Sequence, residues 1–218
     1  MHLEDLPNIA PFHTLDAIDG IRTTALLKAL KSSHAGDDEP LAEICSNDVL
    51  MKQRLANESI KSVSDRNDIP WDDATLLWMA ITQTNKDGKP IPLDKGRARE
   101  GVGRLHWGDG SPVSYLLEHI IEEVDSGLVQ LLQKLNYGLS ESEVGHNRFD
   151  EGFAGLSLRG WLSENEVIQL RGILLHTSWG VAADEPFDGG VRHVVKHLVI
   201  ILRSARSRGF GIMLRKHA

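Results

Sequence analysis

Residues 190–214, GVRHVVKHLVIILRSARSRGFGIML, are the stretch that decides the fold. Apolar residues recur there every three or four positions, which is the spacing of one face of an amphipathic helix. These residues are Val191, Val194, Val195, Leu198, Leu202 and Ala205. Gly209 predicts the end of the helix, and from Phe210 to Leu214 apolar residues alternate with others, as they do in a strand. The stretch therefore predicts a long helix followed by a short strand.

Six further segments carry the periodicity and the end signals of helices: residues 19–31, 41–57, 70–85, 111–124, 126–138 and 163–174. The segment 41–57 fits one helix or two. Asp19, Ser111 and Ser126 each have the side chain of an N-cap residue. The string from Ser163 to Glu166 matches a capping box, in which the serine hydroxyl and the glutamate carboxylate satisfy each other's backbone N–H groups.

The rest of the chain predicts little sheet. Residues 153–161 are apolar and punctuated by glycine, and we expect 153–158 to lie beside the strand 210–214. Residues 86–112 are rich in Gly, Pro and charge and form the longest irregular region. The predicted fold class is mainly α with a small β-sheet (α+β), as a compact multi-helix single domain over residues 1–218. A subdivision of the domain would fall in the polar stretch 139–152.

Charge is distributed unevenly along the chain. The formal net charge is −7, but no acidic residue follows Asp188, whereas seven basic residues do. Residues 1–188 hold 31 acidic and 17 basic residues, a formal charge of −14. An acidic body favours solubility or a basic partner and argues against general nucleic-acid binding. The basic end either packs near the acidic body, is solvated, or binds an anion or a partner.

Acidic side chains are the first candidates for a functional surface. Glu118 and Glu122 are like charges one turn apart on the polar face of the predicted helix 111–124. The full set of candidate partner-binding residues is Glu118, Glu122, Glu123, Asp125, Glu141 and Glu143. Such carboxylates form either a solvated face or a patch that docks a basic protein, and paired carboxylates also occur in general acid–base sites.

The long terminal helix carries two alternative sites. The spacing of His193 and His197 places both imidazoles on one exposed helix face, as a metal site requires, and Asp188 in the preceding loop is a candidate third ligand. A solvated or partner-facing histidine pair is the other interpretation. The candidate anion-binding residues on the same helix are Arg192, Lys196, Arg203 and Arg206. They lack the interleaved aromatic residues of single-strand binders, which makes a nucleic-acid partner the weaker expectation.

Familiar catalytic motifs are missing from the sequence. Residues 155–159, GLSLR, lack the second glycine of a nucleophile elbow. The glycines between Gly96 and Gly103 match neither a P-loop nor a dinucleotide-binding fingerprint. The loop around His106 and Trp107 either binds an anion or is tied down by a buried indole. We expect no cofactor.

Composition also limits the cellular setting. Cys45 is the only cysteine, so no intrachain disulfide can form, and its place on an apolar stripe predicts a small buried hydrophobic side chain. No apolar run approaches the ~18 residues of a membrane span, and Glu4 and Asp5 stand where a secretory signal has basic residues. We expect a cytoplasmic protein that does not enter a membrane.

Two strings resemble the end of an uncharacterised bacterial family of small acidic α-rich proteins. They are residues 160–167, GWLSENEV, and residues 208–213, RGFGIM, on either side of an acidic Gly-containing loop and a long helix. The family has a G-Y-L-x-x-x-E-V helix start, a long helix and a terminal strand. The resemblance covers about the last 65 residues and, faintly, residues 93–120. It implies a mixed helical protein with a little sheet and transfers no catalytic residue.

Three functions of different classes follow. The first is a non-enzymatic binding protein whose acidic surface docks a basic partner, in its sharpest form an immunity protein that neutralises a basic nuclease-type toxin. The second is a metal-assisted hydrolase that uses His193 and His197 or the loop with His106. The third is a nucleic-acid or phosphate binder that uses the basic helix. The oligomeric state stays open.

Overall fold

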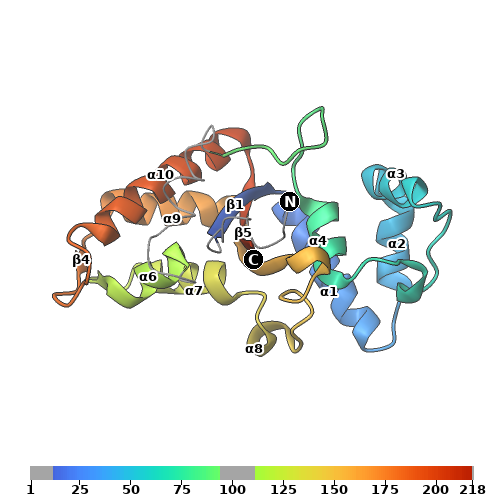
Figure 1. Cartoon of the computed structure of the whole chain (residues 1–218), viewed down its shortest axis with the longest axis horizontal. Coiled ribbons are helices and arrows are strands. Elements are labelled where there is room, and N and C mark those ends of the chain that lie inside the picture. Colours follow the sequence, from blue (N-terminus) through green and yellow to red (C-terminus); the bar gives the residue numbers. More distant parts are fainter. Residues whose placement is uncertain (1–11, 94–110, 218) are drawn as a thin grey trace, which may run out of the picture.

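A three-stranded antiparallel sheet lies between two sets of helices in the computed structural model, which describes residues 12–93 and 111–217 (Figure 1). The strand order is β1-β5-β3, with β1 at Phe12–Ile18, β3 at Ser157–Leu162 and β5 at Gly211–His217. Successive residues of a strand point to opposite faces, so Ile212 and Leu214 belong to one core and Met213 to the other. The molecule is thus a compact single domain of the α+β class.

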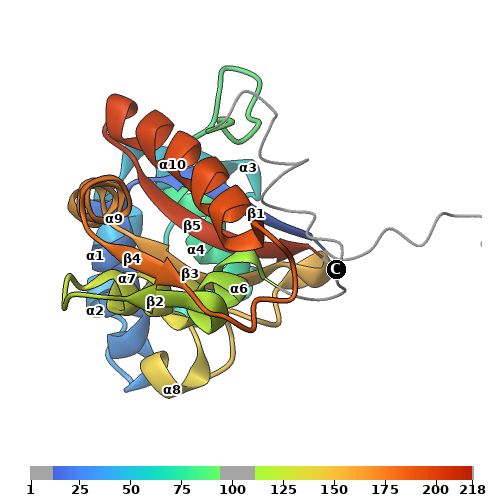
Figure 2. The same ribbon diagram turned by 90° about the vertical axis from the view of Figure 1, so that its left-hand side faces the viewer.

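One face of the sheet is covered by four helices, at the left in Figure 1. They are α6 (Pro112–His119), α7 (Leu128–Tyr137), α9 (Glu164–His176) and α10 (Gly190–Arg208). The apolar stripe of α10 is fully buried here, from Val191 to Ala205. A two-stranded antiparallel sheet of β2 (Ile120–Glu122) and β4 (Trp179–Val181) closes the far end of this layer, where Figure 2 shows the two strands side by side.

The opposite face is covered by the helices of the N-terminal half, at the right in Figure 1. They are α1 (Gly20–His34), α2 (Glu39–Asn47), α3 (Val49–Asn57) and α4 (Asp73–Ile81), with a 3-10 turn, η2, at Arg66–Asp68. The short helix α8 (Glu141–Val144) and a second 3-10 turn, η3 (Phe153–Gly155), follow α7. Leu139 and Phe149 are buried in this core, so the polar stretch 139–152 packs on the domain.

The helix ends confirm several expectations in atomic detail. The carboxylate of Asp19 accepts from the backbone N–H of Arg22 at 2.9 Å, and Ser111 caps α6. The capping box before α9 is present in both directions between Ser163 and Glu166. Gly209, with φ of 68°, ends α10 in the left-handed conformation that favours glycine. Local side-chain chemistry therefore sets these boundaries.

Other boundaries differ from the expectation. The helix predicted for 111–124 ends at His119, and Ile120–Glu122 form β2, because their backbone pairs with β4 across the chain. Ser126 does not cap α7; the N-cap position belongs to Gly127, with φ of 81°. The strand expected at 153–158 begins at Ser157, after η3. The strand pairing itself is confirmed, because β3 runs antiparallel to β5.

The irregular region 86–112 is described only in part. The turn at its start brings Thr84 and Pro90 together in an isolated bridge. The loop with His106 and Trp107 lies outside the described residues.

Candidate functional site

The candidate acidic residues form two groups at the two ends of α7. Glu118 stands in the last turn of α6, and Glu123 and Asp125 stand in the turn that leads into α7; all three are exposed. Glu141 and Glu143 are exposed on α8, just after α7 ends. A helix of ten residues is about 15 Å long, so the two groups are separated by roughly that distance.

Glu122 has a different role, because its carboxylate caps α7. Oε1 accepts hydrogen bonds from the backbone N–H groups of Ser126 (2.8 Å) and Leu128 (2.9 Å) and from the Ser126 hydroxyl (2.6 Å), and Oε2 accepts from the Val129 N–H at 3.4 Å. The hydrogen bonds, the Ser126 hydroxyl first, lower the pKa of Glu122 from 4.5 to about 2. This carboxylate, expected as part of a partner-binding patch, is thus engaged within the fold.

A groove of about 740 Å³ runs along the outer side of α7 between the two acidic groups. Its lining residues are Leu117, Val129, Gln130, Gln133, Lys134, Tyr137, Gly138, Ser142 and Glu143. We call this feature, together with Glu118 and Glu141 beside it, the acidic groove. Tyr137 is 44% exposed, so its ring offers an apolar surface with a polar hydroxyl to a partner.

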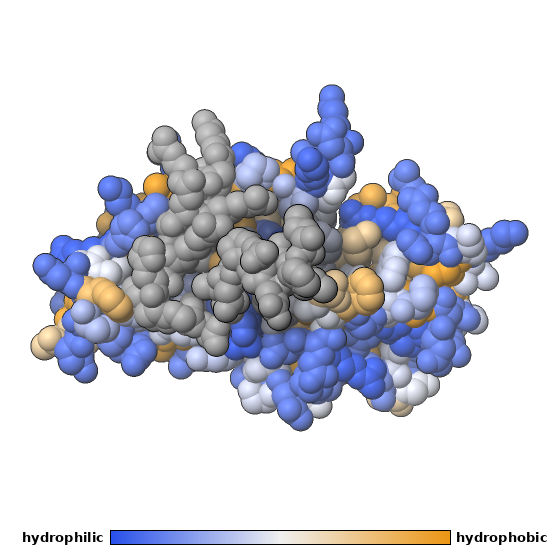
Figure 3. All heavy atoms as spheres, viewed as in Figure 1, coloured by the Kyte–Doolittle hydropathy of each residue, from blue (hydrophilic) through white to orange (hydrophobic). Residues whose placement is uncertain are grey.

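The one lysine in the lining does not make the groove basic. Lys134 Nζ binds both carboxylate oxygens of Glu166, at 2.6 and 2.7 Å, and lies 4.4 Å from the centre of the Trp161 ring. The carboxylate of Glu166 therefore balances the charge of Lys134 within the fold. The side chains around α8, at the bottom of the molecule in Figure 3, are hydrophilic. Glu141 and Glu143 present exposed carboxylates to an approaching partner at this end.

The four candidate anion-binding residues lie together on α10. Arg192, Lys196, Arg203 and Arg206 are all exposed, and at 3.6 residues per turn they fall within a sector of about 80°. None of the ion pairs between described residues involves them. We call these four residues the basic strip.

The histidine pair on the same helix is close but lacks its expected third ligand. The rings of His193 and His197 are 4.4 Å apart; His193 is exposed and His197 is half-buried. Within residues 12–93 and 111–217, Asp188 does not complete a three-ligand group with them. The metal site predicted from these residues therefore rests on the pair alone.

A different set of ligand types does converge, from three segments far apart in the sequence. His34 at the end of α1, Asp73 at the start of α4 and His146 after α8 each offer one donor atom, and these atoms lie within 4.8 Å of one another. Burial opposes ionisation of Asp73, but hydrogen bonds from Arg66 and His34 outweigh it and lower the pKa. Burial, and then the charge of His34, lowers the pKa of His146. No sequence motif indicates this cluster, because its three residues lie in segments far apart in the chain and come together only when the chain folds.

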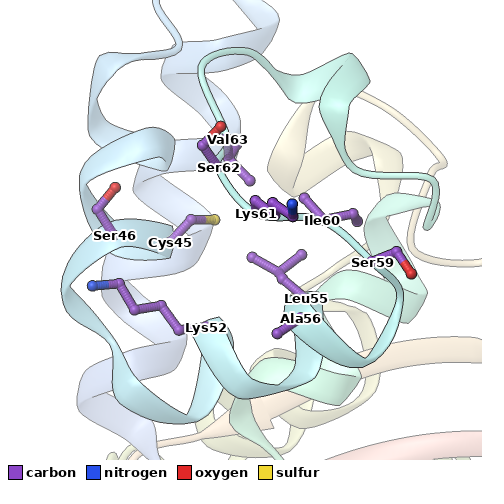
Figure 4. Close-up of a pocket in the computed structure, with 10 residues that line it drawn as sticks. All are labelled: Cys45, Ser46, Lys52, Leu55, Ala56, Ser59, Ile60, Lys61, Ser62 and Val63. Carbon is purple, nitrogen blue, oxygen red and sulfur yellow. The ribbon is translucent and has the colours of Figure 1, made fainter.

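Cys45 lines a second cavity, of about 750 Å³, between α2, α3 and residues 59–63. Figure 4 shows its sulfur among the apolar side chains of Leu55 and Val63. The residue is 3% exposed, and burial raises the thiol pKa to about 11. The expectation of a small buried hydrophobic side chain is confirmed, since such a thiol stays protonated at neutral pH and is a poor nucleophile.

No helix in the described part of the chain has both the length and the apolar character needed to cross a membrane. Comparisons of the chain with models of protein families, with curated proteins and with solved structures find no match.

Proposed function

We propose that this protein binds a basic partner protein through the acidic groove. The observation that carries the proposal is the combination of an exposed aromatic side chain, Tyr137, with exposed carboxylates at both ends of one depression. Aromatic anchors supply much of the binding energy at protein interfaces, and surrounding charges select the partner and speed its approach. A partner with an apolar side chain flanked by Lys or Arg fits this arrangement.

The distribution of charge supports the same partner class. Residues 1–188 carry a formal charge of −14, so the field around the groove attracts cations well beyond the contact itself. Lys134 does not offset the acids at the groove, because Glu166 holds it. An acidic protein would meet like charge at both ends of α7 and would be rejected.

The most specific form of this proposal is an immunity protein that blocks a basic nuclease-type toxin. An inhibitor of this kind must capture its target quickly, and charge complementarity accelerates association. The resemblance of residues 160–167 and 208–213 to a bacterial family of small acidic proteins is compatible with that role. The single cysteine, held as a buried thiol, suits a reducing cytoplasm.

Charge reversal on α8 tests the proposal. The variant E141K/E143K changes two exposed side chains, and the matched control, E43K/E58K, changes two exposed acids on α2 and at the end of α3, outside the lining of the groove. Tagged full-length protein is expressed in its native cells, and the proteins retained on it are quantified at low and high salt. We expect a basic protein to be retained by the parent chain and the control, and to be reduced about tenfold or more by E141K/E143K.

The expected retention also falls with salt, because exposed charges are screened. The proposal fails if the retained proteins are acidic, or if E43K/E58K reduces retention as much as E141K/E143K does. It also fails if the parent chain retains no protein in larger amount than E141K/E143K does.

The basic strip supports a second candidate function, the binding of a polyanion. Four exposed cations within one sector of α10 form a continuous positive face, and such a face neutralises phosphates along a nucleic acid better than scattered surface charges do. The net charge of −7 acts against it.

A further inference from the structure

We infer that His34, Asp73 and His146 form a binding site for a divalent transition-metal ion of the zinc type. This site is separate from the acidic groove and from the histidine pair on α10, and it goes beyond the proposed binding of a basic partner. It ties together α1, α4 and the segment after α8.

The donor set is the first argument. Two imidazoles and one carboxylate are ligands that zinc and related ions accept, whereas magnesium and calcium prefer oxygen ligands alone. Nε2 of His34 lies 2.7 Å from Oδ2 of Asp73, and the donor atom of His146 lies within 4.8 Å of both. Ligand atoms around a tetrahedral zinc ion are about 3.3 Å apart. Small rotations of the side chains are therefore enough to reach that geometry.

The carboxylate of Asp73 is positioned as a metal ligand should be. The residue is 2% exposed, and Arg66 donates to its other oxygen, Oδ1, from Nε at 2.9 Å and from Nη2 at 2.7 Å. Arg66 also donates from Nη1 to the backbone oxygen of Ile69 at 3.0 Å, which fixes the guanidinium. Oδ2 is thereby left facing the imidazoles. Partners that orient a ligating carboxylate in this way raise metal affinity.

His146 is held in place from its own segment. Its ring packs on the buried Phe149, with ring centres 5.3 Å apart, and meets the ring of His34 edge-on at 4.6 Å. The backbone N–H of Arg148 donates to Nδ1 of His146 at 3.3 Å, and this long bond is exchanged when an ion binds, because a ligating imidazole carries its proton on the nitrogen that does not bind the metal. The Arg148 guanidinium is 3.9 Å from Asp73 Oδ2, but that side chain is 56% exposed and can turn into solvent when a cation binds.

Metal binding here would have a consequence for α8. His146 follows α8 by two residues, so an ion that joins it to His34 and Asp73 fastens the segment carrying Glu141 and Glu143 to α1 and α4. A three-point crosslink between segments remote in sequence stabilises the folded state by mass action, since the unfolded chain does not hold the three donors together.

Titration of the full chain with Co²⁺ and Zn²⁺ tests the inference. The chain is stripped with a chelator, and Co²⁺ binding is followed by its visible absorption, with Zn²⁺ as the competitor. We expect one ion per chain and a rise of several degrees in Tm when zinc is present in large excess over Kd. We expect H146Q and H34Q each to weaken binding by about tenfold or more. H176Q, which removes an exposed histidine of α9 outside both clusters, is the matched control and should change nothing.

The double variant H193Q/H197Q separates this site from the histidine pair on α10. It should keep the one-to-one binding and the rise in Tm. The inference is overturned if the parent chain binds neither ion, if H146Q binds as the parent does, or if binding is lost in H193Q/H197Q and retained in H146Q. Circular dichroism of each apo variant verifies the fold, and H146Q is decisive if H34Q does not fold, because His146 lies outside the regular helices.

Discussion

Replacing Glu122 with Gln should destabilise the protein, because this carboxylate caps α7. The side chain accepts bonds from three backbone N–H groups that begin the helix or lead into it, and from the hydroxyl of Ser126. It also places a negative charge at the positive end of the helix. Gln keeps the shape and one acceptor oxygen but loses the charge and part of the bonding.

The size of the effect follows from the pKa of Glu122. A fall from 4.5 to about 2 corresponds to about 3 kcal/mol if fully converted, at 1.36 kcal/mol for each pKa unit. The side chain is partly exposed, so solvent screening reduces that figure, and losses at N-caps are typically about 1 kcal/mol. We therefore expect E122Q to lower the free energy of unfolding by about 1–2 kcal/mol at pH 7.

The loss of stability in E122Q should depend on pH, and this dependence serves as a control. The folded-state pKa of Glu122 is depressed, so its stabilisation is present above about pH 4.5 and is lost as the pH falls towards 2. Urea denaturation of the parent chain and of E122Q should give a constant difference from neutral pH down to about 5, and a shrinking difference below it. E123Q, at the exposed neighbour, should match the parent. The capping role is refuted if E122Q and the parent chain have the same free energy of unfolding at pH 7. It is also refuted if the difference between them stays constant down to pH 2.

Two further predictions concern packing and the basic strip. G160A should lower the free energy of unfolding by about 3 kcal/mol in urea denaturation, because a Cβ there would press on the backbone oxygen of Lys134. G172A, in the middle of α9 with open space around it, should instead stabilise by up to about 1 kcal/mol. If the basic strip binds polyanions, heparin should retain the parent chain in a salt-sensitive way and should not retain R203E/R206E. Retention that is absent or independent of salt would remove that function.

The parts of the fold that could be predicted from the sequence are those fixed by neighbouring residues. The stripe from Val191 to Ala205 defines α10 by itself, and the capping box at Ser163 fixes the start of α9. Both signals lie within a few turns of the chain, so no distant contact was needed to interpret them.

The parts that could not be predicted depend on contacts between distant residues. Ile120 and Ile121 continue the apolar pattern of α6, but their backbone pairs with β4, some sixty residues later, and becomes a strand. The strand β1, at Phe12–Ile18, was not predicted and is ordered by pairing with β5 almost two hundred residues away. Tertiary pairing overrides local pattern in both cases.

In the candidate site too, some features could be predicted from neighbouring residues and others depend on contacts between distant residues. The exposure of Glu141 and Glu143 agrees with the polarity of the stretch 139–152, although the helix α8 was not predicted, and the common face of the basic strip agrees with the periodicity of the terminal helix. The capping bonds of Glu122 did not, because they depend on the chain folding back over residues 123–127. The convergence of His34 and Asp73 with His146 requires three segments to meet, which no spacing in the sequence indicates.

Site-specific photocrosslinking at Tyr137 tests the acidic groove most directly. A photoreactive phenylalanine analogue replaces Tyr137 in the groove or, as the control, Val49, which is exposed on α3 on the other side of the sheet. Irradiation in native cells should yield one adduct with a basic protein from position 137 and none from position 49, and E141K/E143K should abolish it. An adduct with an acidic protein, equal crosslinking from both positions, no adduct at all from position 137, or an adduct that survives the charge reversal would contradict the proposed function.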